Sequence, residues 1–258
     1  MQLDLTGKRA LITAGAGGLG RRTAELFSNA GAKVFICDID QDQLESARDK
    51  IPNLDGMVTD VSDRDALKTM FETGLDYLGG LDILVNNAGT AGPTGPVEGV
   101  DINDWMACIE INLTCTFLMT QMAVPHLREA GGGAIVNLSS AAGKFGFPMR
   151  SPYSAAKWGI VGFTRTVAME LGPDKIRCNC VQPGPVEGDR IDRVIKAKAA
   201  AANISENQMR SEMTSIASLK EFVTADDIAS MILFLCSSAG KHITGQSISV
   251  DGGLEGLV

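Results

Sequence analysis

The chain has few of the residues on which several common catalytic chemistries depend. Only two of its 258 residues are histidines, His126 and His242. Neither lies beside a plausible nucleophile, so a histidine-based hydrolytic triad is not expected. The six cysteines form no Cys-x-x-Cys pair, which argues against a zinc site or a redox motif. We therefore expect buried, reduced thiols and no bound metal.

Positive charge and long apolar runs are also scarce. The formal net charge is -8 and the isoelectric point is about 4.8, the wrong sign for a surface that neutralises nucleic-acid phosphates. The longest apolar run, Ile228 to Cys236, is too short to span a bilayer. The N-terminus lacks the charged and then apolar pattern of a signal peptide. We expect a cytoplasmic protein without nucleic-acid or membrane partners.

Short apolar segments alternate with longer amphipathic ones along the whole chain, a pattern typical of βαβ units. Most are continuous apolar runs, such as Ile83-Leu84-Val85, as expected for strands covered on both faces. No composition change marks a domain boundary. We predict one α/β domain over residues 1–258, a Rossmann-type doubly wound parallel sheet of about seven strands with helices on both faces. The predicted strands are 9–13, 33–38, 54–59, 82–86, 134–138, 177–182 and 246–250.

One segment, residues 185–222, interrupts this alternation because it contains no strand pattern. A connection of this length in a compact domain usually has a function, so we predict a substrate-binding loop. Its apolar residues could line a substrate pocket, but their spacing would equally suit helices packing on each other. The residues concerned are Ile191, Ile195, Met209, Met213 and Ile216.

Four glycines, Gly15, Gly17, Gly18 and Gly20, follow the first predicted strand and open the first predicted helix. Without Cβ atoms, this backbone can approach a pyrophosphate at the positive end of the helix. A tight strand-to-helix turn alone would not need four glycines in six residues. The cluster predicts a dinucleotide site.

Asp38 ends the second predicted strand, about twenty residues after the glycines, as the dinucleotide fingerprint requires. A carboxylate there accepts hydrogen bonds from the adenosine ribose hydroxyls and repels a 2′-phosphate, which favours NAD(H) over NADP(H). The alternative is a solvated acid that caps the next helix. Arg21 and Arg22 leave a small opening for NADP(H), although we expect them to face solvent.

Several motifs occur together and in order. They are Thr-Ala-Gly-Ala-Gly-Gly-Leu-Gly at 13–20, Asn-Asn-Ala-Gly at 86–89, Asn112 within Glu-Ile-Asn-Leu, Ser140, Tyr153-x-x-x-Lys157, Pro183-Gly184 and Val-Asp-Gly-Gly at 250–253. With this set the chain resembles the short-chain dehydrogenase/reductase family over its whole length. No single motif would carry the resemblance.

The resemblance implies a catalytic group of four residues. Tyr153 would exchange the hydroxyl proton while a hydride moves between the substrate carbon and the nicotinamide. Lys157, four residues later on the same helix face, would favour the phenolate and bind the nicotinamide ribose. Ser140 would hydrogen-bond the reacting oxygen, and Asn112 would hold a water that links Lys157 to solvent.

The resemblance also implies the cofactor contacts. Asp60 would touch the adenine amino group, although a helix-capping role is the competing interpretation. The expected cofactor-binding residues are Gly15, Gly17, Gly18, Leu19, Gly20, Asp38, Asp60, Val61, Asn87, Ala88, Gly89, Tyr153, Lys157, Pro183, Gly184 and Val186.

The chain departs from the family pattern at two positions. Ala14 replaces the first signature glycine, which is tolerable if the residue is extended. Gly188 replaces a threonine that contacts the cofactor carboxamide, so the clamp on the nicotinamide is in doubt.

Three functions remain open. The favoured one is an NAD-dependent dehydrogenase of a secondary alcohol, such as a polyol, sugar or small hydroxy compound. A 3-oxoacyl-(acyl-carrier-protein) reductase is second, disfavoured by its expected NADPH preference and by the acidic charge of this chain. A non-catalytic dinucleotide-binding scaffold is third. By analogy with the family we expect a homo-oligomer, a tetramer or dimer, with the apolar stretch 109–122 either at the interface or in the core.

Overall fold

The computed structural model describes residues 3–257, apart from the side chains of residues 189, 190, 197, 198 and 201. Seven parallel strands form one sheet in the order β3-β2-β1-β4-β5-β6-β7. The predicted fold class is confirmed, and every strand end lies within one residue of its predicted position. The strands are β1 (Arg9–Thr13), β2 (Lys33–Asp38), β3 (Leu54–Val58), β4 (Ile83–Asn86), β5 (Gly133–Leu138), β6 (Ile176–Pro183) and β7 (Ser247–Val250).

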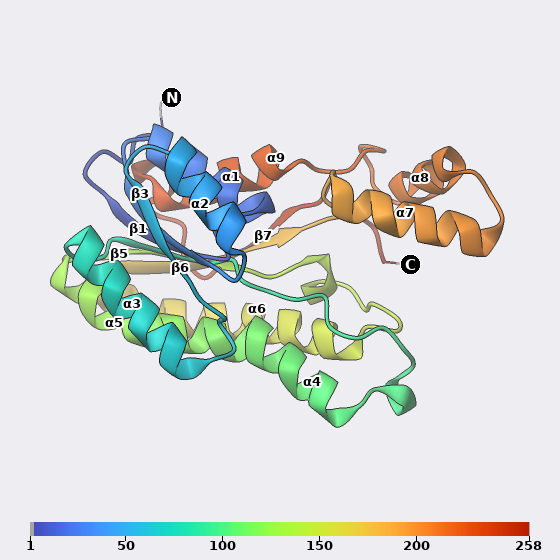
Figure 1. Cartoon of the computed structure of the whole chain (residues 1–258), viewed down its shortest axis with the longest axis horizontal. Coiled ribbons are helices and arrows are strands. Elements are labelled where there is room, and N and C mark those ends of the chain that lie inside the picture. Colours follow the sequence, from blue (N-terminus) through green and yellow to red (C-terminus); the bar gives the residue numbers. More distant parts are fainter. Residues whose placement is uncertain (1–2, 258) are drawn as a thin grey trace.

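Helices cover both faces of the sheet (Figure 1). One face carries α1 (Gly18–Asn29), α2 (Gln41–Lys50) and α9 (Ala225–Cys236). The other carries α3 (Arg64–Leu78), α5 (Cys115–Glu129) and α6 (Ser151–Leu171), and α4 (Ile102–Ile109) packs on α6. The strand order reverses between β1 and β4, so a crevice opens at the carboxyl ends of these two strands, where ligands of such sheets bind.

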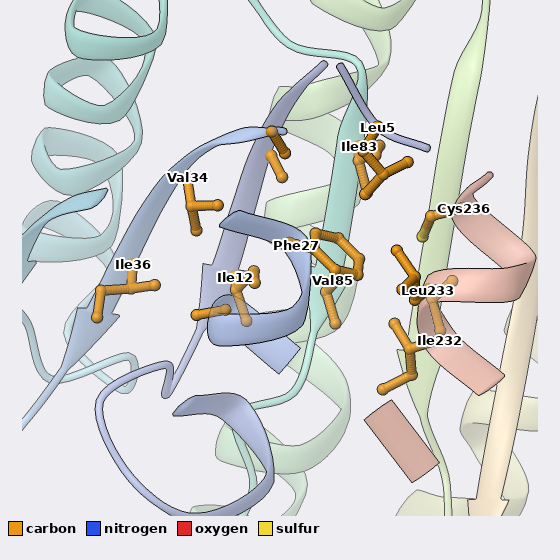
Figure 2. Packing of buried hydrophobic residues seen from close by; sticks show 14 of the residues in the cluster. Leu5, Ile12, Phe27, Val34, Ile36, Ile83, Val85, Ile232, Leu233 and Cys236 are labelled. Atoms are coloured by element: carbon orange, nitrogen blue, oxygen red, sulfur yellow. The ribbon is translucent and has the colours of Figure 1, made fainter. Parts of the chain in front are cut away.

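Neighbouring residues of one strand enter opposite cores, which explains why the strands are continuous apolar runs. Ile12, Val34 and Val85 pack under α1 and α9 with Phe27 and Ile232 (Figure 2). The residues between them along the strands belong to the opposite core under α3, α5 and α6. Those residues are Leu11, Phe35 and Leu84.

Residues Ile102–Glu129 form one continuous helical stretch of 28 residues that contains an 18-residue window with mean hydropathy 1.3. By length and composition alone this stretch could cross a membrane, a possibility that the search for unbroken apolar runs missed. In the structure, however, its α5 part packs on β4 and β5 and its α4 part packs on α6. The stretch therefore packs as one of the helices that cover the sheet.

The segment after β6 forms two helices, α7 (Asp189–Ala202) and α8 (Glu206–Ser215), which stand at the side of the sheet (Figure 1). Between them Ile195 and Met209 are buried in a small core of their own with Phe222. Helix packing therefore explains these two residues, whereas Ile216 packs with Leu254 of the C-terminal segment. A bridge between Val186 and Val223 closes the base of the segment, which we call the lid (residues 185–222).

Candidate active site

The glycines after β1 form the turn that the sequence predicted. Gly17 is the N-cap of α1, and the helix starts at Gly18, whose φ is +50°. A Cβ at Gly20 would lie 2.0 Å from the carbonyl oxygen of Ala14, so this position accepts no side chain. A Cβ at Gly15 would collide with Ile36. The turn therefore presents bare backbone at a helix N-terminus, which suits a phosphate group.

Asn87 ties the end of β4 to this turn. Its Nδ2 donates to the carbonyl oxygens of Thr13 at 3.0 Å and Ala14 at 2.9 Å. In return, Thr13 Oγ1 accepts the backbone N–H groups of Asn87 and Ala88 at 3.0 and 2.9 Å. Asn87 and Ala88 were expected to touch the cofactor. The structure shows that they also fix the crevice, and that Thr13 is a partner to which the sequence analysis gave no role.

Ala14 is not extended, so the condition under which its methyl group is tolerated without strain is not met. Its φ is +50°, in the left-handed region that disfavours any residue with a Cβ. The turn forces this angle, because the carbonyl of Ala14 must face both Asn87 and the close-packed Gly20. Ala14 therefore carries backbone strain in the loop that would hold the cofactor.

Asp38 lies at the end of β2 against the glycine turn. Its Oδ2 accepts the backbone N–H of Ala16 at 3.0 Å, and its Oδ1 accepts that of Asp40 at 3.2 Å. The capping alternative is wrong for Asp38, because the N-cap of α2 is Asp40, which accepts from Gln43. The carboxylate is thus held beside the turn, where the adenosine ribose is expected.

The two arginines of α1 are paired with acids. Arg21 Nε lies 3.3 Å from Glu25 Oε1. Arg22 bonds Glu25 and Asp226, at 2.9 and 2.5 Å. Both guanidinium groups therefore form ion pairs within the protein, with Glu25 and Asp226.

Asp60 follows β3 in an exposed turn, where its Oδ1 accepts the N–H and the hydroxyl of Ser62 at 2.9 and 2.7 Å. These two bonds hold the pKa of Asp60 below its usual value. The capping alternative is wrong here too, because Asp63 is the N-cap of α3. Val61 lies beside Asp60 and packs against the core under α3.

Tyr153 and Lys157 lie on the first two turns of α6 and face one another. The Lys157 ammonium lies 5.6 Å from the centre of the Tyr153 ring, and only 4% of Lys157 is exposed. Its Nζ donates to the carbonyl oxygen of Leu138, at the end of β5, at 2.8 Å. Ser139 Oγ anchors the same turn by donating to the Lys157 carbonyl at 2.8 Å, a contact that the sequence analysis missed.

Asn112 reaches the same place from a π-helical segment, η2 (Glu110–Thr114), between α4 and α5. Such local widening of a helix is frequent at functional sites. The side chain is buried, and its Nδ2 donates to the carbonyls of Cys108 at 2.9 Å and Thr90 at 3.1 Å. Its Oδ1 is buried and has no hydrogen-bond partner within the described part of the chain. A Cβ at Gly89 would lie 2.8 Å from this oxygen and 3.4 Å from Lys157 Nζ, so both atoms converge above Gly89.

Ser140 directly follows β5 and begins a short helix, η3 (Ala141–Gly143), in which its Oγ accepts the N–H of Ala142 at 3.2 Å. η3 packs on α6. The polar group Asn112, Ser140, Tyr153 and Lys157 is therefore carried by three separate stretches of chain, η2, the junction of β5 and η3, and α6.

The end of β6 and the start of the lid form the remaining wall. A Cβ at Gly184 would lie 2.9 Å from Asp251 Cα, so Pro183-Gly184 packs tightly on the segment after β7. Asp251 is buried and pairs with Lys144 Nζ at 3.2 Å, which joins this segment to the loop after η3. Gly188 is the N-cap of α7 with φ +131°, an angle that a threonine would rarely adopt.

The six cysteines are all buried and reduced, as predicted. Burial is the main cause that raises the pKa of Cys37, Cys115 and Cys236 to about 12. These three thiols are therefore poor nucleophiles.

Comparison with known proteins defines the class of this chain. A family model described as "Enoyl-(Acyl carrier protein) reductase" matches residues 14–255. An uncharacterized short-chain type dehydrogenase/reductase, y4mP, of Sinorhizobium fredii is 36% identical over 97% of this chain and 98% of its own length. The chain belongs to the short-chain dehydrogenase/reductase family and is an oxidoreductase that uses a nicotinamide cofactor.

Two further relatives show different reactions within this family. The 3-oxoacyl-[acyl-carrier-protein] reductase FabG of Thermotoga maritima is 37% identical, over 98% of this chain and 99% of its own length. The trans-4-hydroxycyclohexanecarboxylate dehydrogenase of Sinomonas cyclohexanicum is 36% identical, over 95% and 92%. Similarity at this level does not choose between a carrier-bound ketone and a free alcohol.

Proposed function

We propose that this protein is an NAD(H)-dependent dehydrogenase/reductase that interconverts a secondary alcohol and a ketone, with a polyol, sugar or small hydroxy compound as substrate. The observation that carries the proposal is the pairing of Tyr153 with the buried ammonium of Lys157 at the carboxyl edge of the sheet. Burying a charged lysine beside a tyrosine is costly, and a role in proton transfer explains why the chain does so.

The residues present fit a nicotinamide dinucleotide. The glycine turn offers backbone without Cβ atoms at a helix N-terminus, and the carboxylate of Asp38 is fixed beside this turn. Gly15, Gly17, Gly18, Leu19 and Gly20 would hold the pyrophosphate. When bound, the nicotinamide accepts or gives the hydride.

The proton chemistry belongs to the chain itself. Tyr153 Oη takes the hydroxyl proton of the alcohol during oxidation and returns it during reduction. The positive charge of Lys157 favours the phenolate form of Tyr153. Ser140 donates to the reacting oxygen, and Asn112 Oδ1 holds a water that relays the proton from Lys157 to solvent.

Asp38 supports a preference for NAD(H). Its carboxylate is fixed beside the glycine turn by two backbone N–H groups, so a 2′-phosphate placed there meets a negative charge. The two arginines that would offset this charge are paired with Glu25 and Asp226.

The second candidate is a 3-oxoacyl-(acyl-carrier-protein) reductase, favoured by the FabG name of a relative that matches over its full length. The acidic charge of the chain disfavours it, because carrier proteins are themselves acidic and would be repelled. The name of the other relative, which acts on a free cyclic hydroxy acid, favours the first candidate.

We also propose a soluble, cytoplasmic homo-oligomer, a dimer or tetramer. Within the stretch 109–122, Met119 is core, but Phe117 is exposed, as are Trp158 and Met169 on the neighbouring α6. Apolar side chains on adjacent helices suit a twofold contact. Light scattering at micromolar concentration should give two or four times the mass of the chain, and a monomer would contradict the proposal.

The experiment that tests the function is an initial-rate survey of the purified protein with NAD and with NADP. The substrates are polyols, sugars, hydroxy acids and acyl thioesters of the 3-oxo class. Turnover of a free alcohol with NAD supports the first candidate. Turnover of the thioesters with strict NADPH selectivity supports the second, and tight NAD binding without turnover of any compound favours a non-catalytic scaffold.

A further inference from the structure

Arg150 lies three residues before Tyr153, at the N-cap of α6, and its guanidinium group lies between two rings. Its Cζ is 5.5 Å from the centre of the Tyr153 ring and 5.6 Å from that of Phe147. The residue is only partly exposed. No motif of the sequence analysis drew attention to it, and the proton-transfer chemistry does not use it.

The bonds that Arg150 makes are to neutral acceptors only. Nη1 donates to Thr94 Oγ1 at 2.9 Å, and Nη2 donates to the carbonyl of Ala91 at 2.5 Å. Nε is buried and has no hydrogen-bond partner among the residues that the structure describes. A guanidinium group has five N–H donors, so each Nη carries a second N–H that these two bonds do not use.

Three other partly buried arginines of the chain lie in environments that compensate their charge. Arg9 and Arg22 each have a carboxylate oxygen within 3 Å. Arg177, which lacks one, donates to the carbonyls of Leu235 and Gly240 near the C-terminal end of α9, where a helix favours positive charge. Among the side chains that the structure describes, which exclude Asp189, no carboxylate comes within ion-pair distance of Arg150.

Two cations therefore flank the ring of Tyr153, Arg150 at 5.5 Å and Lys157 at 5.6 Å. Both also act on the buried thiol of Cys108, whose pKa burial raises and these two charges lower. The guanidinium group of Arg150 is only partly exposed and has no carboxylate partner among the described side chains, so it attracts an anion, and a carboxylate matches its planar fork.

We propose that Arg150 is a specificity-determining residue that binds a carboxylate of the substrate, so that the protein acts on a hydroxy acid or oxo acid. This inference rests on the proposed alcohol/ketone function, since it takes the reacting carbon to lie at the Tyr153 hydroxyl. The guanidinium carbon lies 5.5 Å from the centre of the Tyr153 ring that carries this hydroxyl. In the substrate, the carboxylate and the carbinol carbon should therefore be separated by only a few bonds. Thr94 and Ala91 hold the fork in place, which limits the entropy lost on binding.

The test measures binding, so it does not need the physiological substrate. Cyclohexanecarboxylate and its neutral analogue cyclohexanecarboxamide are titrated calorimetrically into the protein saturated with NADH. The wild type should bind the carboxylate at least about tenfold more tightly than the amide, because hydrogen bonds to a charged group are the stronger ones. Arg150→Gln should abolish this preference and leave the affinity for NADH unchanged.

Matched variants separate charge from structure. Arg165→Gln removes an exposed arginine of the same helix and should keep the full preference. Thr94→Val removes one hydrogen bond to the guanidinium group but leaves its charge, so this variant should keep most of the carboxylate preference. Arg150→Lys keeps the charge without the fork, so the preference should fall but not vanish, and this variant decides the question if Arg150→Gln does not fold.

A wild type without a carboxylate preference, or an Arg150→Gln or Arg150→Lys variant that keeps it in full, overturns the proposal for Arg150. Turnover of neutral alcohols as fast as of hydroxy acids would also overturn it and leave the proposed function standing. Arg150-dependent carboxylate binding in a protein that turns over no alcohol would support the proposal for Arg150 and contradict the proposed function.

Discussion

Replacing Ala14 by glycine should stabilise the protein, although the change removes a methyl group. The left-handed φ of +50° at Ala14 costs a residue with a Cβ roughly 1–2 kcal/mol in the folded state. Glycine removes that strain but loses about 0.5–1 kcal/mol more backbone entropy on folding. The net gain should be about 0.5–1 kcal/mol in the free energy of unfolding, or about 1–4 °C in Tm for a chain of this size.

The assay is urea unfolding of the wild type, Ala14→Gly and Ala16→Gly, with the midpoint and the slope fitted separately. Ala16 is the matched control, because it lies in the same turn, is fully buried and has no positive φ. Its replacement removes a buried methyl and adds chain entropy, so it should destabilise by about 1 kcal/mol. If both variants lose stability equally, the strain assigned to Ala14 does not exist.

Three further predictions follow from the contacts of single side chains. Asp38→Asn should reduce the preference for NAD over NADP by about tenfold or more, measured as the ratio of kcat/KM; an unchanged ratio would remove Asp38 from the selection of cofactor. Asn87→Ala leaves two backbone carbonyls without their donor and should lower the free energy of unfolding by about 1–3 kcal/mol in urea; a neutral effect would show that water replaces the amide. Asp227 has a lowered pKa because the backbone N–H and the hydroxyl of Thr224 bond its carboxylate in the capping box of α9. Its stabilisation is therefore present above the unfolded pKa of about 4 and lost as the pH falls through the lower folded pKa. The stability gap between wild type and Asp227→Asn should thus be constant near neutrality and close below about pH 4, and a gap that persists at lower pH would contradict this assignment.

Much of the fold was predictable because its determinants are local. Runs such as Ile83-Leu84-Val85 predict strands buried on both faces, and the glycines after β1 predict a turn into a helix. The spacing of four residues placed Tyr153 and Lys157 on one face of a predicted helix, and the resemblance to the family implied their roles.

What sequence reasoning missed depends on contacts between distant segments or on exact backbone angles. The φ of Ala14 follows from its carbonyl facing Asn87, 73 residues away. The helix caps fall on Asp40 and Asp63, two and three residues later than the acids considered, because a cap is set by where the helix starts. The position of Arg150 beside Tyr153 depends on the loop that carries Ala91 and Thr94. Motif spacing contains none of this information.

The central claim is that Tyr153 moves the proton of an alcohol under the influence of Lys157. The most direct measurement is the single-turnover rate of NADH formation by wild type, Tyr153→Phe and Tyr77→Phe, with the best alcohol from the substrate survey. Tyr77, on α3, is the other tyrosine of the chain and the matched control. The account predicts that Tyr153→Phe lowers the rate by about a hundredfold or more with NAD affinity unchanged, while Tyr77→Phe reacts like the wild type. A Tyr153→Phe variant that forms NADH at the wild-type rate would contradict it.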